Sequence, residues 1–333
     1  MGVARWPVLA MALFAAGCSS SDGQQDHGIP GDGPGQTDGA VVDRQVAPTE
    51  SGTDRRLPDA KPWPTKPCGF KTGTQDDVPA GTNSAFTMGG KPRLFLVLKV
   101  NVPAGYTGKL PVVFAYHGYA SKAVNFNGGS WAAGSNKPHL KVVPQAIDPN
   151  TLPVWDFKAK GDDSVDIKFF DEMLGCLNAE FSVDNDRVHL IGSSMGGIFA
   201  AYVFTHRGNQ VASFMTGSGG FATPFSYCSW PTAQLVAALT NKAAALIMWG
   251  GVDDKPSWDF NKAAKDTIQT LRGNGHFVVQ CDHGLGHEWP DDINPYIYQF
   301  FEDHPRGVKP DPYASGLPST KWGAWPSYCS VAP

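Results

Sequence analysis

The chain has 333 residues, of which 41% are hydrophobic and 17% are charged, and its formal net charge is −4. This length is enough for one α/β domain with a complete hydrophobic core and additional tails. No cluster of Lys and Arg occurs, so the sequence has no electrostatic basis for binding nucleic acid, and a neutral or weakly charged substrate is expected.

The first 17 residues predict an export signal. Arg5 precedes an apolar run at 8–16, which is too short to span a bilayer and is typical of the central region of a signal peptide. Residues 13–18 resemble a bacterial lipoprotein signal, which implies that a lipid is attached to Cys18. An ordinary cleaved secretion signal is the alternative. Both interpretations predict an exported protein, either anchored to the cell envelope or outer surface by the lipid alone, or secreted.

Residues 18–67 are rich in Gly, Asp, Pro, Ser and Gln and lack apolar periodicity. Such a segment cannot bury enough surface to offset its ordering entropy, so it is predicted to be a disordered tether. A catalytic domain at 68–305 and a C-terminal extension at 306–333 are expected to follow.

Five cysteines remain beside Cys18, and an oxidising compartment favours disulfide bonds between them. An odd number leaves at least one unpaired, and the partners cannot be identified from the sequence. A bridge between Cys68 and Cys329 would join the two ends of the folded part. The chain has no CxxC motif, which argues against a redox pair or a zinc knuckle. The five are Cys68, Cys176, Cys228, Cys281 and Cys329.

Strands and helices are predicted to alternate along the folded part. Near-continuous apolar strands suit a parallel sheet that is covered on both faces. Ser164 or Asp163 is expected to cap the first long helix. The pattern predicts an α/β fold with a mostly parallel, doubly wound sheet and helices on both faces. The predicted strands are 94–102, 110–116, 141–144, 187–191, 211–216, 244–249 and 276–280, and the predicted helices contain 167–177, 197–207, 260–271 and 293–301.

The pentapeptide Gly-Ser-Ser-Met-Gly at 192–196 stands between an apolar strand and a helix of small apolar residues. In that context it predicts a nucleophile elbow, a sharp turn that exposes the side chain of Ser194. Without that context the same five residues would indicate only a surface turn.

Three further loops follow predicted strands, at 117–118, 250–254 and 283–290. Because functional groups collect at the carboxyl ends of parallel strands, we expect these loops and the elbow to meet. The order Ser194, Asp253, His287 is the order of nucleophile, acid and base in α/β-hydrolases, with the adjacent Asp254 as the alternative acid. The backbone N–H groups of Met195 and Tyr119 are expected to form the oxyanion hole, with Ala120 as the alternative to Tyr119.

Other histidines have simpler interpretations. His283 is expected to be an exposed loop residue, and His189, inside an apolar strand, a core residue. A zinc site of Asp282, His283 and His287 is disfavoured because the HExxH spacing is absent. No metal and no cofactor are expected.

The segment Gly-Leu-Gly-His-Glu-Trp-Pro at 284–290 resembles the histidine loop of secreted poly(3-hydroxybutyrate) depolymerase-like and feruloyl esterase-like α/β-hydrolases. Residues 68–70, 117–118, 155–156 and the elbow fall in the order of that family. The resemblance covers residues 67–304 and implies a secreted serine esterase acting on hydroxyalkanoate polyesters or on aromatic acyl groups esterified to plant polysaccharide. It also favours Asp253 as the acid. The stretch 221–241 is short for a lid over the substrate.

Aromatic residues are candidates for an acyl-binding surface, and the loop at 126–131 is expected to reach the cleft. The leading hypothesis is a carboxylic ester hydrolase that works through an acyl-enzyme. The alternatives are an inactive surface protein of the same fold that binds polysaccharide or polyester, and, less favoured, a serine peptidase. The aromatic candidates are Trp155, Trp289, Trp258, Tyr119 and Phe221.

Overall fold

The computed structural model describes residues 67–127, 137–147, 154–158, 160–221, 230–309 and 311–333. The predicted signal, Cys18 and almost all of the tether lie outside the described residues. The same holds for Cys228, for most of the predicted loop at 126–131 and for part of the short lid segment.

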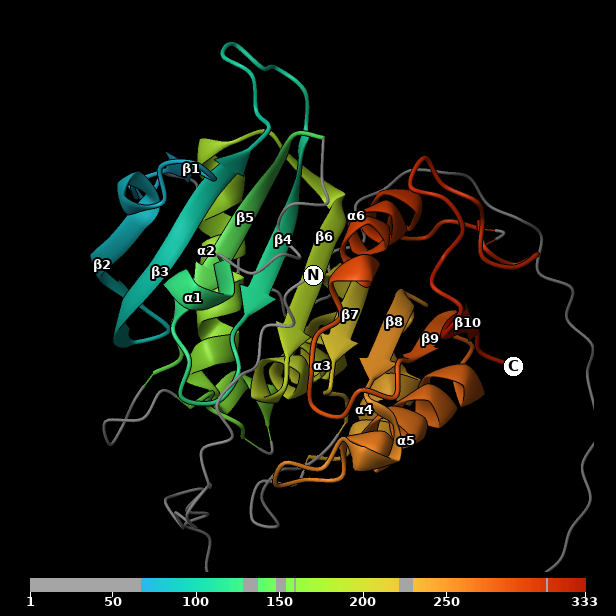
Figure 1. The fold of residues 1–333 in the computed structure, drawn as a ribbon. Coiled ribbons are helices and arrows are strands. Elements are labelled where there is room, and N and C mark those ends of the chain that lie inside the picture. The colour runs from blue at the N-terminus through green and yellow to red at the C-terminus, as the bar shows by residue number, and fades with distance from the viewer. Residues whose placement is uncertain (1–66, 128–136, 148–153, 159, 222–229, 310) are drawn as a thin grey trace, which may run out of the picture. The chain divides into compact units, whose positions relative to one another are not determined.

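The described chain forms one ten-stranded sheet with the strand order β1-β3-β5-β4-β6-β7-β8-β9-β10, and β2 pairs with β3 (Figure 1). The strands from β5 to β9 in that order are parallel, as predicted. Within this sheet, the antiparallel pairs lie towards the two edges, where β3 joins β5 and β2 and where β10 joins β9. The strands are β1 (Gly73–Thr74), β2 (Thr82–Met88), β3 (Lys91–Val100), β4 (Leu110–Tyr116), β5 (His139–Pro144), β6 (Val183–Ser193), β7 (Ser213–Gly217), β8 (Ala244–Trp249), β9 (Val278–Asp282) and β10 (Cys329–Val331).

Helices cover both faces of the sheet (Figure 1). On one face, side chains of α1 and α6 share a hydrophobic cluster with strand residues such as Ile191 and Leu246. On the other face, Phe170 of α2 packs on Phe114 of β4, and Phe204 of α3 stacks on Phe214 of β7. The helices are α1 (Ala123–Asn127), α2 (Val165–Glu180), α3 (Met195–Arg207), α4 (Thr232–Ala238), α5 (Phe260–Gly273) and α6 (Asn294–Asp303).

The two longest helices, α2 and α5, begin where their sequences provide a side-chain cap. The Ser164 hydroxyl accepts a hydrogen bond from the Ile167 N–H at 3.2 Å, so the predicted cap of α2 is confirmed. The Asp259 carboxylate accepts from the Lys262 N–H at 2.8 Å and starts α5. The helix α5 ends at Gly273, as the Gly-Asn-Gly stretch predicts.

Two disulfide bonds correct the predicted pairing. Cys68 is bonded to Cys176 of α2, and Cys281 of β9 is bonded to Cys329 of β10. A bridge between Cys68 and Cys329 is therefore wrong. The reason is topological, because β1 and β10 lie at opposite edges of the sheet and its whole width separates the two ends of the folded part.

The segment after α6 packs against the domain. Tyr313 and Trp325 are buried in the hydrophobic cluster beneath α6, and Tyr313 donates a hydrogen bond to the Asp303 carboxylate at 2.8 Å. The strand β10 then covers β9, which would otherwise be a sheet edge with unpaired backbone groups. The predicted C-terminal extension is thus built onto the sheet.

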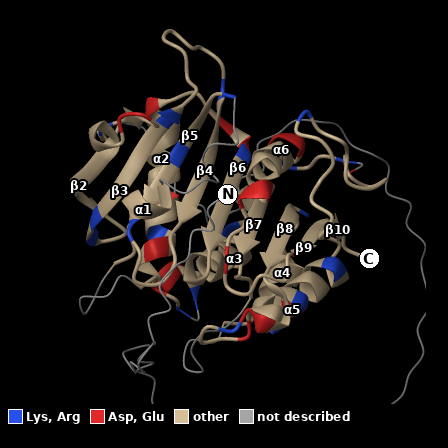
Figure 2. Cartoon of the chain, viewed as in Figure 1, with Lys and Arg blue, Asp and Glu red and all other residues tan. Residues whose placement is uncertain are grey.

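Charged residues of the described chain are scattered over several elements and do not gather in one patch in the view of Figure 2. Among the described residues, no helix combines the length and the apolar composition that crossing a membrane requires.

Candidate active site

The elbow has the geometry that its sequence predicts. Ser194 stands between β6 and α3 with φ 56° and ψ −125°, a backbone conformation that residues other than glycine rarely adopt. The turn is possible because glycines let the backbones meet. A Cβ on Gly192 would lie 2.1 Å from the Gly196 carbonyl oxygen, and one on Gly196 would lie 2.0 Å from the Tyr116 carbonyl oxygen.

Three side chains form a hydrogen-bonded chain at the carboxyl ends of β6, β8 and β9. The His287 Nε2 is 3.0 Å from the Ser194 Oγ, and the His287 Nδ1 is 2.7 Å from the Asp254 Oδ1. Since a carboxylate only accepts, Nδ1 carries the proton, which leaves the Nε2 lone pair to accept the serine proton. The loops predicted to meet at this edge of the sheet do meet.

The carboxylate that contacts His287 belongs to Asp254 and not to the predicted Asp253. Asp254 is fully buried, and its second oxygen accepts a hydrogen bond from the Gly250 N–H at 3.0 Å. Asp253 is exposed to solvent. Gly251 adopts φ +76° and starts a 3₁₀ turn over Gly251–Asp253, which directs the next residue inward. Buried and paired on both oxygens, Asp254 is fixed in position behind the imidazole.

The loop that carries Asp254 packs against the loop that carries His287 through their backbones. The Gly286 N–H donates to the Gly250 carbonyl at 2.9 Å, and the His283 N–H donates to the Trp249 carbonyl at 3.0 Å. A Cβ on Gly250 would lie 1.7 Å from the Gly286 carbonyl oxygen, so only glycine is tolerated there. This contact sets the distance between acid and base.

Phe260 is a site residue that the sequence did not reveal. Its buried ring stacks on the His287 imidazole, with 4.8 Å between centroids and 27° between planes. In the sequence it is the first apolar residue of an amphipathic helix, and nothing distinguishes it from a core residue. The contact limits rotation of the imidazole while Asp254 holds its Nδ1 side.

The two predicted oxyanion donors lie on segments next to the nucleophile. Met195 is the first residue of α3, and N–H groups in the first turn of a helix have no intrahelical partner. The loop after β4 approaches Ser194 so closely that a Cβ on Gly118 would lie 3.4 Å from the serine Cβ. Tyr119 follows, half-buried, and Ala120 has φ +53°. The assignment of the Tyr119 N–H stays a prediction.

His117 is buried beneath this loop and is held neutral. Its Nε2 accepts from the Ala146 N–H at 3.0 Å, so its proton is on Nδ1, which donates to the Gly118 carbonyl at 2.8 Å. Burial lowers the pKa of His117 to about 4, although the hydrogen bond to Gly118 opposes the shift. The sequence marked the dipeptide 117–118 but assigned no role to the imidazole or to its other partner, Gln145.

The three tryptophans predicted to bind substrate differ in their surroundings. Trp155 is buried, stacks on Phe199 and donates to the His117 carbonyl at 2.9 Å, so it is a core residue and that prediction is wrong. Trp289 is half-buried and donates to the Asn294 side chain at 2.8 Å. Trp258 is half-buried, with its ring nearly perpendicular to that of Phe260. A role of Trp289 and Trp258 towards a substrate stays a prediction.

Two further histidines, His189 and His283, can be compared with their predicted surroundings. His189 is buried on β6 with its Nδ1 2.9 Å from the Ser213 hydroxyl, which confirms the predicted core role. His283 is half-buried, where exposure was expected. Its Nδ1 accepts from the Leu285 N–H at 3.2 Å, and burial lowers its pKa. Within the described ranges, no three His, Cys, Asp or Glu side chains are grouped to hold a metal ion.

Comparisons with known proteins identify similar hydrolases. Residues 96–306 match the family model Esterase, described as "Putative esterase". The oxidized polyvinyl alcohol hydrolase of Sphingopyxis sp. (strain 113P3) is 24% identical over 311 residues, covering 72% of this chain and 83% of that protein.

Solved structures show the same fold at low identity. A structure named sOPH, in its native form, has a TM-score of 0.57 and 21% identity, covering 82% of this chain and 97% of its own. The acetyl xylan esterase from Aspergillus awamori has a TM-score of 0.51 and 13% identity, covering 66% and 98%. A ferulic acid esterase has a TM-score of 0.50 and 15% identity, covering 66% and 96%.

The family model spans most of the described domain and includes the elbow, the acid loop and the histidine loop. The chain therefore belongs to the Esterase family, as a carboxylic ester hydrolase with the α/β-hydrolase fold.

Proposed function

We propose that the protein hydrolyses carboxylic esters through an acyl-enzyme on Ser194, with His287 as general base and acid and Asp254 as the residue that orients His287. The observation that carries the proposal is the hydrogen-bonded chain from Ser194 Oγ through His287 to the buried Asp254. A serine hydroxyl is a weak nucleophile until such a base removes its proton.

In the first half-reaction, Oγ attacks the ester carbonyl carbon while Nε2 takes the hydroxyl proton. The carbonyl oxygen becomes negative and accepts hydrogen bonds from the Met195 and Tyr119 N–H groups. The imidazolium then gives its proton to the departing alcohol oxygen. In the second half-reaction, water attacks the acyl-enzyme with the same base, releasing the acid and restoring Ser194.

Each part contributes to the rate. General-base catalysis contributes roughly 10²- to 10⁴-fold, and each oxyanion donor about 10²- to 10³-fold. Asp254 contributes by keeping the proton on Nδ1 and by stabilising the imidazolium as it forms. Phe260 supports the same ring orientation from the face of the imidazole.

For the substrate, we propose feruloyl esters of plant polysaccharide or hydroxybutyrate polyesters. The histidine loop and the fold shared with a ferulic acid esterase and an acetyl xylan esterase support this class. We further propose that the protein is exported, with a lipid on Cys18 or in secreted form. The two disulfide bonds agree with an oxidising compartment. Fractionating cells that express Cys18→Ala tests the anchor. If a lipid on Cys18 holds the protein at the membrane, the variant should be lost from the membrane fraction.

A second candidate is hydrolysis within an oxidised polyvinyl alcohol chain. The similarity to oxidized polyvinyl alcohol hydrolase favours it, because the match extends over 83% of that protein. Where the oxidised chain carries two carbonyls separated by one carbon, Ser194 can attack one of them in the same way. The bond from that carbonyl carbon to the intervening carbon then breaks, and the leaving group is the enolate of the second carbonyl. Proton delivery from His287 would serve both leaving groups.

The test of the mechanism is the turnover of p-nitrophenyl butyrate by the wild type, Ser194→Ala and Ser193→Ala. Ser193 is the neighbouring residue at the end of β6 and serves as the matched control. We expect Ser194→Ala to lose about 10⁴-fold or more in kcat, whereas the control keeps its rate within about threefold. Equal rates for wild type and Ser194→Ala would contradict the proposal.

The substrate class needs a separate comparison. Methyl ferulate, hydroxybutyrate oligomers, acetylated xylan and oxidised polyvinyl alcohol, assayed side by side, rank the two candidates by kcat/KM. An inactive binding protein would leave Ser194 unlabelled by a fluorophosphonate probe while still binding the polymers. Rapid stoichiometric labelling excludes that alternative.

A further inference from the structure

We propose that Gln145 is a positioning residue for the reaction, and that with His117 it holds the oxyanion loop, defined as residues 118–121, in its active conformation. This inference rests on the proposed function, because it concerns the second oxyanion donor of that mechanism. Gln145 follows β5 and is distant in sequence from the catalytic residues.

The side chain of Gln145 has one defined orientation. Its Oε1 accepts from the Ala123 N–H at 2.8 Å, and its Nε2 donates to the Ser121 carbonyl at 3.2 Å. A backbone N–H only donates and a carbonyl only accepts, so the amide cannot be flipped. The second hydrogen on Nε2 then points to the His117 Nε2, 2.9 Å away. All three of these bonds reach residues 117–123.

Through its contact with His117, Gln145 also fixes the start of the oxyanion loop at Gly118. Because the Ala146 N–H and the Gln145 amide both donate to Nε2, the imidazole proton stays on Nδ1 and points at the Gly118 carbonyl, 2.8 Å away. The backbone N–H of Gln145 in turn donates to the Leu94 carbonyl of β3 at 2.9 Å, which ties the arrangement to the sheet.

The loop itself needs this support. Ala120 has φ +53°, and the Ser121 N–H closes the turn on the Gly118 carbonyl at 3.2 Å. A left-handed residue other than glycine is strained and persists only where its surroundings impose it. Gln145 secures one end of the turn at the Ser121 carbonyl, and His117 secures the other at Gly118.

The oxyanion loop lies where its conformation should affect the rate of ester hydrolysis. Gly118 lies directly beside Ser194, and the N–H of the next residue is the proposed donor to the tetrahedral oxyanion. Such a donor stabilises the transition state only when it lies within hydrogen-bond distance of the charge that develops there. Loosening the turn should therefore lower kcat and leave ground-state binding of the ester almost unchanged.

The experiment compares Gln145→Met with Gln280→Met, using p-nitrophenyl butyrate and a trifluoromethyl ketone inhibitor. Methionine keeps the length of the side chain and removes its hydrogen bonds. Gln280 lies on β9 and donates to the Ser330 hydroxyl at 3.2 Å, away from the oxyanion loop. For Gln145→Met we expect kcat to fall about 10- to 100-fold with KM within about threefold. The inhibition constant of the ketone, whose adduct carries an oxyanion, should rise in parallel, while Gln280→Met behaves as wild type.

Gln145→Glu is the second variant, in case Gln145→Met does not fold. Its carboxylate still accepts from the Ala123 N–H but cannot donate to His117 or Ser121, so the same loss of kcat is expected. Wild-type kcat in either folded variant overturns the inference, and so does a loss of kcat without a weaker ketone inhibition. A wild-type enzyme that turns over no ester would refute the proposed function itself, a result that the wild-type assay identifies before any variant is compared.

Discussion

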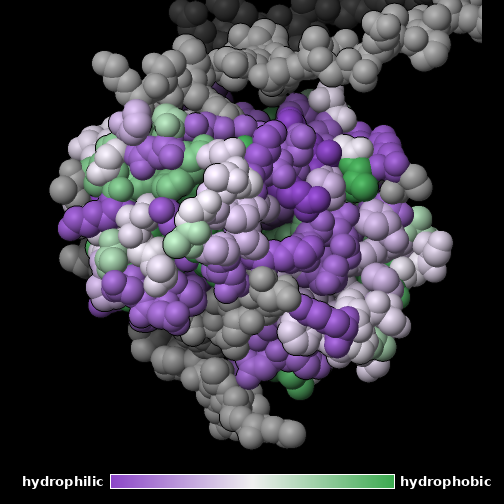
Figure 3. Space-filling view, turned by 90° about the horizontal axis from the view of Figure 1, so that it is seen from above, coloured by the Kyte–Doolittle hydropathy of each residue, from purple (hydrophilic) through white to green (hydrophobic). Residues whose placement is uncertain are grey.

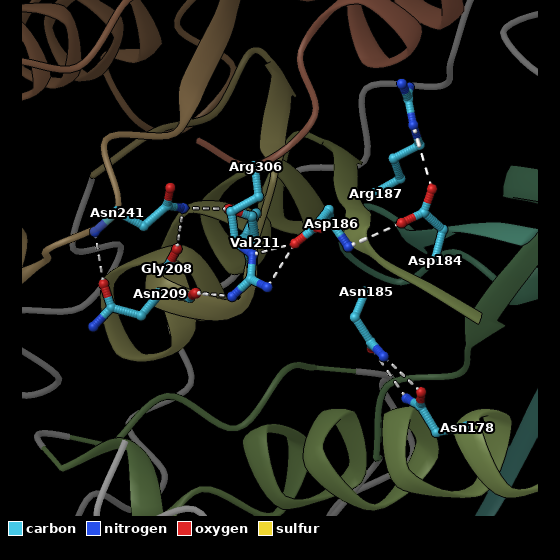
Figure 4. A network of polar contacts seen from close by, with 10 residues as sticks. All are labelled: Asn178, Asp184, Asn185, Asp186, Arg187, Gly208, Asn209, Val211, Asn241 and Arg306. Carbon is cyan, nitrogen blue, oxygen red and sulfur yellow. Dashed lines mark hydrogen bonds and ion pairs between the residues drawn. The ribbon is translucent and has the colours of Figure 1, made fainter. Parts of the chain in front are cut away.

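The two ends of the parallel strands differ in how their polar groups are used. At the carboxyl ends, Ser194 and Ala120 hold left-handed backbone, and the loops meet through glycine contacts. At the amino ends, polar groups satisfy one another (Figure 4). Asn178 and Asn185 exchange two amide hydrogen bonds, and Arg306 pairs with Asp186 at 2.6 Å.

The amino ends nevertheless have the features by which a site is often recognised. A cavity of about 230 Å³ opens there, and this end of the molecule is mostly hydrophilic (Figure 3). Four of the five Lys, Arg, Asp and Glu side chains that line the cavity, however, are matched to one another. Arg187 pairs with Asp184 at 3.4 Å and donates to the Glu302 carbonyl at 2.6 Å, and Lys137 pairs with the Glu302 carboxylate at 2.8 Å. Strained backbone and a base aligned on a nucleophile identify the reactive end better than a cavity or charge does.

The largest expected effect is a difference in kcat between variants of two neighbouring carboxylates at the reactive end. Asp254→Asn should lower kcat about 10³- to 10⁴-fold, because an amide favours the wrong imidazole tautomer. Asp253→Asn, at an exposed position, should change kcat by less than about threefold. Steady-state hydrolysis of p-nitrophenyl butyrate by both variants measures the difference. A large loss in Asp253→Asn with a normal rate in Asp254→Asn would reverse the assignment.

Buried histidines should make stability depend on pH at both ends. Burial lowers the pKa of His117 and His276 to about 4, and that of His189 well below its usual value. Below about pH 6.5 the unfolded chain therefore binds protons that the folded chain excludes, so the free energy of unfolding falls as pH falls. Each residue should contribute about 1.4 kcal/mol per pH unit between 6.5 and 4.

Urea unfolding at pH 7.5, 6 and 5 measures how steeply the free energy of unfolding changes with pH. His276→Asn should reduce this pH dependence by the contribution of one histidine. An asparagine at this position still has a donor for the Ala243 carbonyl, which His276 now contacts through Nδ1 at 3.0 Å. The same unfolding midpoint at pH 7.5 and pH 5 would contradict the expectation.

The smallest effect tests the amino ends. The Asn241 side chain donates to the Gly208 carbonyl at 2.9 Å and to the Val211 carbonyl at 2.7 Å. Asn241→Leu should lower the free energy of unfolding by about 1–3 kcal/mol, since both carbonyls lose a partner. The kcat of the folded variant should stay at the wild-type value. A reduced kcat with unchanged stability would show that the two ends are coupled.

The sequence predicts the centre of the fold better than its edges. The strands predicted at 110–116 and 244–249 match β4 and β8 residue for residue, because continuous apolar runs are decisive for buried parallel strands. The strands β1, β2 and β10 were not predicted. They are short or polar, and they form by pairing with β3 and β9.

The site shows the same division. Ser194 and His287 were predicted from local motifs, and the structure joins them. The acid was misassigned by one residue, because a left-handed turn at Gly251 decides which of two adjacent carboxylates points inward. Phe260 and Gln145 have no motif, since their roles arise from contacts with residues 27 and 28 positions away in sequence.

The glycine contact between the acid and base loops has a consequence for how relatives of this protein are recognised. A Cβ at Gly250 would overlap the backbone of Gly286. The two adjacent aspartates, Asp253 and Asp254, in contrast look equally acceptable as the acid in the sequence. In an alignment, the paired glycines are therefore the more reliable anchor. Counting four residues from the first glycine identifies the acid, and one residue from the second identifies the base.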